Sequence, residues 1–201
     1  MTHRRPKAVR PFAFVLSFTI LLSACGVNSI PRAEEEAKAK WADLQAAYQR
    51  RMDTLPSLAQ TVGASSQHER RLQVGVAEAR SNVDRAQVGG DQLTDPAAMQ
   101  RFAEAQRQVS ALVIRMIQEM PPENRANENY ATLMQQIEGA NNRITISIRD
   151  YNEAVRAYNT RIRTFPDLIG ARIIYGSDPM VPFEAQEGAE RAPTLDFGNQ
   201  Q

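Results

Sequence analysis

The stretch that decides the fold reads NENYATLMQQIEGANNRITISIRDYNEAVRAYNTRIRTF and occupies residues 127–165. Its apolar residues recur at spacings of three and four, which places them on one face of an α-helix. They are Tyr130, Leu133, Ile137, Ala140, Ile144, Ile148, Tyr151, Val155, Tyr158, Ile162 and Phe165. Two successive spacings of four around Ile144 form a stutter, which locally unwinds a left-handed supercoil. The pattern predicts one helix spanning about 58 Å at 1.5 Å per residue, ended by Pro166.

A first helix is predicted to begin near Pro31, a residue tolerated in the first helical turn. Its apolar stripe consists of Trp41, Leu44, Tyr48, Leu55, Leu58 and Val62. Arg51 is a polar exception on this stripe. Pro56 should kink the helix because it removes a backbone hydrogen bond to Met52. Gly63 suits the end of the helix.

Two shorter helices are expected between the long ones. Ser66 and Glu69 have the spacing of a capping box, which predicts that a second helix begins there and continues to about residue 88. The alternative is that residues 33–88 form one long bent helix. Asp95 and Pro96 have the residue types preferred at a helix start, and Pro121-Pro122 should end this third helix.

The fold class that follows is all-α. Four amphipathic helices with short connections predict an elongated, antiparallel, up-and-down four-helix bundle over residues 33–166, with its first and last helices longest. Residues 167–201 contain several prolines and glycines and no clear helical stripe. They are expected to form an extended, irregular C-terminal tail that partly docks on the bundle, anchored by Phe183 and Phe197.

The N-terminus has the order of a secretory signal. A basic region with Arg4, Arg5, Lys7 and Arg10 precedes an apolar run over residues 12–22, and small residues then precede Cys25. This order predicts a lipoprotein signal peptide at residues 1–24, lipid attachment at Cys25 and a tether at 25–32. An uncleaved membrane span would need roughly 20 apolar residues, and a lone cysteine could also be a buried apolar residue. Gly26 favours the outer membrane over the inner one.

Composition argues against several classes of protein. Removal of four basic and no acidic residues with the signal changes the formal net charge from +1 to about −3, which does not suit a nucleic-acid-binding protein. The mature chain keeps one histidine, His68. Its neighbours Ser65, Ser66 and Glu69 could suggest a hydrolase, but helix capping explains them more simply. We expect no catalytic residues, no metal site and no cofactor.

Polar residues on or beside the stripes are the candidate binding residues. They are Arg51, Asp53, Asn142, Arg143, Arg149, Asn152 and Asn159. One interpretation is an interhelical network that pairs buried polar groups and sets helix register, with Arg51 and Asp53 close to the carbonyls freed by Pro56. The other is a groove for a partner peptide or an anionic ligand. Both stay open at this point.

Several short motifs lie in the two long predicted helices. They are Trp41-Ala42-Asp43-Leu44, Leu55-Pro56-x-Leu58, Asn127-Glu128-Asn129-Tyr130, Asn142-Arg143-Ile144 and the run Tyr151-Asn152-x-Ala154-Val155-x-x-Tyr158-Asn159. Together they resemble the LemA family. The resemblance covers nearly the whole mature chain and implies an envelope-bound helical bundle facing away from the cytoplasm. It implies no settled activity. Two features depart from the family pattern: a lipid cysteine replaces the usual N-terminal membrane helix, and Ser57 replaces the usual asparagine.

The expected function is therefore that of a non-enzymatic scaffold or adaptor. The protein would be held by its lipid to the periplasmic face of a membrane and would present its bundle and tail to another envelope protein. The alternatives are an enzyme acting on the cell wall and a ligand or ion sensor that uses the arginine and asparagine cluster.

Overall fold

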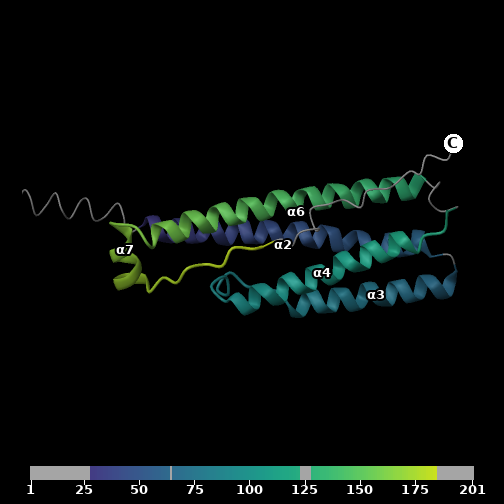
Figure 1. Ribbon diagram of the computed structural model, residues 1–201, viewed down its shortest axis with the longest axis horizontal. Coiled ribbons are helices and arrows are strands. Elements are labelled where there is room, and N and C mark those ends of the chain that lie inside the picture. The colour runs from purple at the N-terminus through teal and green to yellow at the C-terminus, as the bar shows by residue number, and fades with distance from the viewer. Residues whose placement is uncertain (1–27, 64, 123–127, 185–201) are drawn as a thin grey trace, which may run out of the picture.

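The computed structural model describes residues 28–63, 65–122 and 128–184 (Figure 1). Four long helices account for most of them: α2 (Ser29–Val62), α3 (Ser66–Arg85), α4 (Pro96–Gln118) and α6 (Glu128–Arg161). The short helix α7 (Asp167–Gly170) and the π-helical turn η1 (Ala171–Tyr175) follow. The predicted all-α class is confirmed, and the described residues contain no strand.

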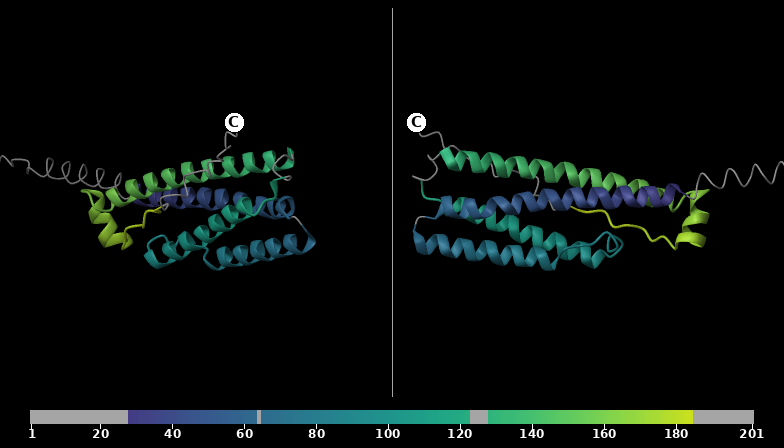
Figure 2. Two further views of the ribbon diagram at one scale, coloured as in Figure 1. Left: turned by 45° about the vertical axis from the view of Figure 1, so that its right-hand side comes forward. Right: turned by 180° about the vertical axis from the view of Figure 1, so that it is seen from behind.

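The four long helices run alternately up and down the long axis of an elongated molecule (Figures 1 and 2). Helix α2 is central and contacts α6 on one side and α3 and α4 on the other. Helices α2 and α6 have 34 residues each, whereas α3 has 20 and α4 has 23. The predicted order of helix lengths is therefore confirmed.

Because the helices differ in length, the bundle has four helices over only part of its length. Two apolar clusters divide the core. In one, the C-terminal half of α2 packs against α3, α4 and the beginning of α6. In the other, the N-terminal half of α2 packs against the end of α6, the turn near Leu93 and the C-terminal segment, which we define as residues 176–184. Figure 1 shows this segment as an extended strand-like trace between the long helices and the start of α4.

Helices α2 and α3 are separate, so the prediction of two helices is confirmed and the single bent helix is wrong. Gly63 ends α2, with its amide donating to the Ala59 carbonyl at 3.1 Å. A Cβ at Gly63 would lie 2.7 Å from Cβ of Glu69. Only glycine therefore lets the start of α3 fold back this closely on the end of α2.

The cap of α3 differs from the prediction. Ser65, not Ser66, is the N-cap, and its side chain accepts a hydrogen bond from the His68 amide at 3.2 Å. Glu69 lies one residue too far along for a capping box, and its Cβ and Cγ pack beside Gly63 instead. The capping box at Ser66 and Glu69 is wrong by one residue because this contact sets where the helix starts.

The predicted ends of the long helices shift by a few residues. Helix α2 begins at Ser29, inside the predicted tether, because Ile30 is fully buried in the core. Helix α3 ends at Arg85, which frees the Val88 carbonyl to accept from the Trp41 indole at 2.8 Å. Pro96 opens α4 as predicted, with the Asp95 side chain as N-cap.

The region after α6 is more ordered than predicted. Helix α6 ends at Arg161, and Phe165, expected at the end of the buried stripe, is exposed. Helix α7 and η1 follow, and the prediction of a tail without helix missed both. The irregular C-terminal segment is confirmed for residues 176–184, and Phe183 is buried as expected. Residues 1–24, the part of the tether at 25–27 that includes Cys25, and Phe197 lie outside the described residues. None of the helices in the described ranges is long and apolar enough to cross a membrane.

Candidate functional site

Two asparagines of α6 hold the backbone of the C-terminal segment. Asn152 Nδ2 donates to the Phe183 carbonyl at 2.8 Å, and its Oδ1 accepts from the Phe183 amide at 2.8 Å. Asn159 makes the same pair of bonds with Met180, at 2.8 and 2.9 Å. We call these two residues the asparagine clamp. Each side chain thus satisfies a backbone donor and acceptor that would otherwise need a neighbouring strand.

The spacing of the clamp follows from helix and strand geometry. Asn152 and Asn159 are seven residues apart on α6, which corresponds to a rise of about 10.5 Å. Met180 and Phe183 are three residues apart in an extended chain, which spans about 10 Å. The two distances match, so the segment can run antiparallel to α6 and meet both asparagines. The repeated Tyr-Asn pairs of α6 are the signal in the sequence from which this ladder could have been found.

Two tyrosines next to the clamp bind the same segment. Tyr151 Oη donates to the Val181 carbonyl at 2.9 Å, and Tyr158 Oη donates to the Asp178 carbonyl at 3.2 Å. Burial raises the pKa of both phenols, so they stay protonated donors at neutral pH. On the other side, the Val181 amide donates to the Leu93 carbonyl at 2.8 Å. The segment is therefore joined to both α6 and the turn before α4.

An aromatic cluster lies beneath the segment. Phe183 packs 5.8 Å from Phe102 of α4 and 6.0 Å from Trp41 of α2, measured between ring centroids. Trp41 is also 5.1 Å from Tyr151. These tilted and edge-on contacts are favourable geometries for aromatic pairs. Phe183 thus connects the C-terminal segment to three of the long helices.

Two shallow hollows flank the segment. One of about 400 Å³ lies on the α6 side and is lined by both clamp asparagines, Arg156, Arg163 and Pro182. The other, of about 480 Å³, lies on the α4 side between Arg107, Met99 and residues 181–184. Both are open, so they resemble surface for a macromolecule more than an enclosed ligand cavity.

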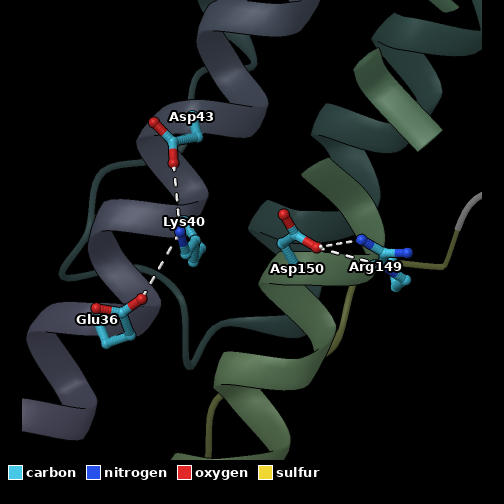
Figure 3. A network of polar contacts seen from close by, with 5 residues as sticks. All are labelled: Glu36, Lys40, Asp43, Arg149 and Asp150. Carbon is cyan, nitrogen blue, oxygen red and sulfur yellow. Dashed lines mark hydrogen bonds and ion pairs between the residues drawn. The ribbon is translucent and has the colours of Figure 1, made fainter. Parts of the chain in front are cut away.

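The predicted binding residues do not come together in one groove. Asn152 and Asn159 are occupied by the chain's own backbone. Asn142 and Arg143 are exposed on α6. Arg149 is exposed as well and pairs with its neighbour Asp150 at 3.0 Å. Figure 3 shows that pair on α6 apart from a second charged group on α2, in which Lys40 lies between Glu36 and Asp43.

Arg51 and Asp53 contact different helices. Asp53 is exposed and pairs with Arg80 of α3 at 3.2 Å. Arg51 is buried between α2 and α4, where it donates to Oε1 of Gln106 at 3.1 Å, to the Gln106 carbonyl at 3.3 Å and to Ser110 Oγ at 3.1 Å. Its guanidinium lies 5.2 Å from the ring centroid of Tyr48. The two residues therefore do not form a pair, because residues two positions apart on a helix lie on different faces.

Burial lowers the pKa of Arg51, yet a guanidinium stays charged in proteins. Among the described residues, no carboxylate lies within ion-pair distance of it. Carbonyl, amide, hydroxyl and ring partners instead solvate the charge. Sequence reasoning found Arg51 but missed Gln106 and Ser110, whose polar side chains fall on the α4 face that meets α2.

His68 lies in the first turn of α3, beside the Ser65 cap. Its backbone amide completes the Ser65 cap, and its Nε2 lies 3.8 Å from a carboxylate oxygen of Glu119. Over the described ranges, no group of three or more histidine, cysteine or acidic side chains could hold a metal ion.

Comparison with known proteins identifies the family. The LemA family matches over residues 40–197, which is most of the chain. A search of curated proteins found no match. The family match covers α2 from residue 40 onward, the other three long helices and the C-terminal segment. The asparagine clamp therefore lies within the matched region.

Proposed function

This chain belongs to the LemA family, and from that premise we propose that it is a lipid-anchored scaffold or adaptor of the cell envelope. Cys25 carries the lipid, the bundle lies on the extracytoplasmic side, and a surface of the bundle binds another envelope protein. The partner surface includes the C-terminal segment and the two hollows beside it.

The proposal rests on the way in which the asparagine clamp and its two neighbouring tyrosines hold the C-terminal segment. Six polar contacts from Asn152, Asn159, Tyr151 and Tyr158 fix the backbone of residues 178–183 along α6. Glu184 is exposed at the end of this segment. The described part of the chain therefore ends beside α4, at a place that these contacts fix. A segment that orders on binding can wrap a partner's surface, and this attachment gives such a segment a fixed starting point.

The test is site-specific photocrosslinking in intact cells. A photoreactive residue replaces exposed Pro182 or Glu184 in the full chain, and exposed Gln135 near the start of α6 serves as the control position. We expect one envelope protein to be captured from 182 and 184 and not from 135. The same crosslink should disappear when residues 185–201 are deleted, while the helical circular dichroism and cooperative melting remain.

Two outcomes count against the proposal. Equal capture from Pro182 and Gln135 means that the C-terminal segment is not a partner surface. Unchanged capture after deletion of 185–201 restricts the contact to the hollows and removes the tail from it. Anchoring is tested separately: Cys25→Ala should abolish incorporation of labelled fatty acid, and an unmodified thiol on an intact N-terminus would exclude the lipid.

A further inference from the structure

The end of the molecule formed by α7 and η1 exposes large apolar side chains. Phe165 is 80% exposed, Ile173 78%, Ile174 59% and Ile169 52%. We call these four residues the apolar tip. Phe165 lies in the turn just before α7, Ile169 lies in α7, and Ile173 and Ile174 lie in η1, so all four belong to one short stretch of chain. Elsewhere in the described chain, large exposed apolar residues such as Val74, Ile114 and Ile146 lie on different helices. Single residues of that kind need no explanation, whereas a contiguous group indicates a contact surface.

The apolar tip is firmly attached to the bundle. Ser29 Oγ donates to a carboxylate oxygen of Asp167 at 2.6 Å, which joins the first turn of α2 to α7. Ala171 is buried in the core, and a Cβ at Gly170 would lie 3.6 Å from Ile30 Cδ1. Gly176 then adopts a φ of +57°, which turns the chain back toward the bundle. These contacts attach α7 and η1 to the bundle through Ala171, whereas Ile173 and Ile174 of η1 stay exposed.

The tip also lies where the N-terminal part of the chain joins the fold. Helix α7 and the beginning of α2 share one end of the long axis (Figures 1 and 2). Ser29 is four residues from Cys25, so an extended chain between them spans at most about 14 Å. The apolar run at residues 12–22 lies just before Cys25. Whatever membrane holds Cys25 is therefore within reach of the tip.

Arginines flank the tip, and one of them, Arg161, lies 4.0 Å from Asp167. Between residues 161 and 178, Arg161, Arg163 and Arg172 outnumber Asp167 and Asp178. Arg161 and Arg32 also line a hollow of about 620 Å³ between the start of α2 and the end of α6, together with Glu36. Apolar side chains flanked by arginines are typical of segments that lie in the membrane interface, where apolar groups enter about 5–10 Å.

We propose that the apolar tip inserts into the interfacial region of the phospholipid bilayer that carries the anchor. The proposal rests on the membrane anchoring proposed above. Lipid at Cys25 and the tip then act as two membrane contacts on one rigid end, and two contacts bind more stably than one. With α2 rising about 51 Å for its 34 residues, the bundle points away from the bilayer and the turn between α2 and α3 is farthest from it.

The test is photocrosslinking to lipid in the full chain. A diazirine amino acid replaces Ile173 or Ile169, and replaces Val74 or Ile114 in the matched controls, which are exposed apolar positions on α3 and α4. We expect phospholipid adducts, detected by mass spectrometry, at 173 and 169 and none at 74 or 114. Adding Phe165→Ser and Ile174→Ser should lower the adduct yield at 173 without changing the melting temperature.

The controls separate this proposal from the anchoring itself. A chain that sediments with membranes but gives no lipid adduct at 173 overturns the tip proposal and leaves anchoring intact. Protein adducts in place of lipid adducts at 173 and 169 show that a protein partner covers the tip, and also overturn it. A chain recovered without membranes overturns both proposals. Equal lipid adducts at all four positions indicate a bundle lying flat on the bilayer, which contradicts the proposed orientation.

Discussion

Asn152 acts toward Phe183 as a neighbouring β-strand would, since its amide group donates to the carbonyl and accepts from the amide of the same residue, both at 2.8 Å. A helix side chain thereby takes over the pairing of an extended segment that has no sheet to join. Asn159 repeats the arrangement at Met180. The match between a seven-residue helical rise and a three-residue extended step makes the repetition possible.

The first prediction concerns this clamp. Asn152→Asp should release the C-terminal segment at neutral pH, because the donor to the Phe183 carbonyl becomes a carboxylate oxygen that repels it. The loss should be about 1–3 kcal/mol of local stability, measured as faster hydrogen exchange of the Met180 and Phe183 amides. Asn142→Asp, on the exposed surface of α6, is the control. Unchanged exchange in Asn152→Asp would show that the clamp contributes nothing to docking.

The second prediction compares the buried C-terminal segment with the exposed apolar tip. Phe183→Ala removes a buried ring that contacts Trp41 and Phe102, so the free energy of unfolding should fall by about 3–5 kcal/mol. Phe165→Ala removes an exposed ring and should change it by about 0.5 kcal/mol or less. Urea denaturation of both variants makes the comparison. Similar losses at the two positions would mean that the segment is not part of the core.

The third prediction concerns Arg51. Arg51→Ala leaves the Gln106 side chain without its buried donor and opens space beside Tyr48, so stability should fall by about 1–3 kcal/mol. Arg51→Met should lose less, because it refills the space and removes a buried charge that lacks a carboxylate partner. Exposed Arg50 gives the control Arg50→Ala, with a change near zero. Equal melting temperatures for the alanine variants at 50 and 51 would contradict the burial of Arg51.

The fourth prediction is a loss of stability at alkaline pH. Burial raises the pKa of Tyr48 to about 12, whereas an unfolded tyrosine has a pKa near 10. The folded state therefore keeps its proton while the unfolded state loses it. Ionisation of Tyr48 therefore leaves the free energy of unfolding unchanged below about pH 10 and lowers it as the pH rises toward 12. By this linkage Tyr48 alone contributes a loss of about 3 kcal/mol across the window.

The measurement is urea denaturation at about pH 8 and about pH 11, below and within that window. Tyr48→Phe should reduce the alkaline loss, and the part that remains comes from Tyr151 and Tyr158, whose pKa values burial also raises. Tyr175→Phe, at an exposed position, should leave the loss unchanged. An identical pH profile for Tyr48→Phe and the parent chain would show that Tyr48 does not carry the effect.

Much of the fold could be predicted because it depends on local pattern. The three-and-four spacing of Tyr130 to Ile162 reports which face of α6 is buried, and Gly63, Asp95 and Pro96 mark helix ends by their own backbone preferences. The predicted helix boundaries differ from the observed ones where a contact with a distant residue determines the boundary. Ile30 extends the start of α2 by burial, and packing of Glu69 against Gly63 moves the cap of α3 to Ser65.

The sequence by itself determined that the protein is a set of four amphipathic helices, which of them are long, and that Arg51, Asn152 and Asn159 interrupt the apolar faces. Only the tertiary structure decided what those residues bind. Gln106 accepts a hydrogen bond from the Arg51 guanidinium. Asn152 and Asn159 bind the backbone of Phe183 and Met180. The physical reason is that periodicity tells which face of a helix is covered and not what covers it. A backbone amide and carbonyl are present in almost every residue, so the partner of a side chain that binds them has no signature in the sequence.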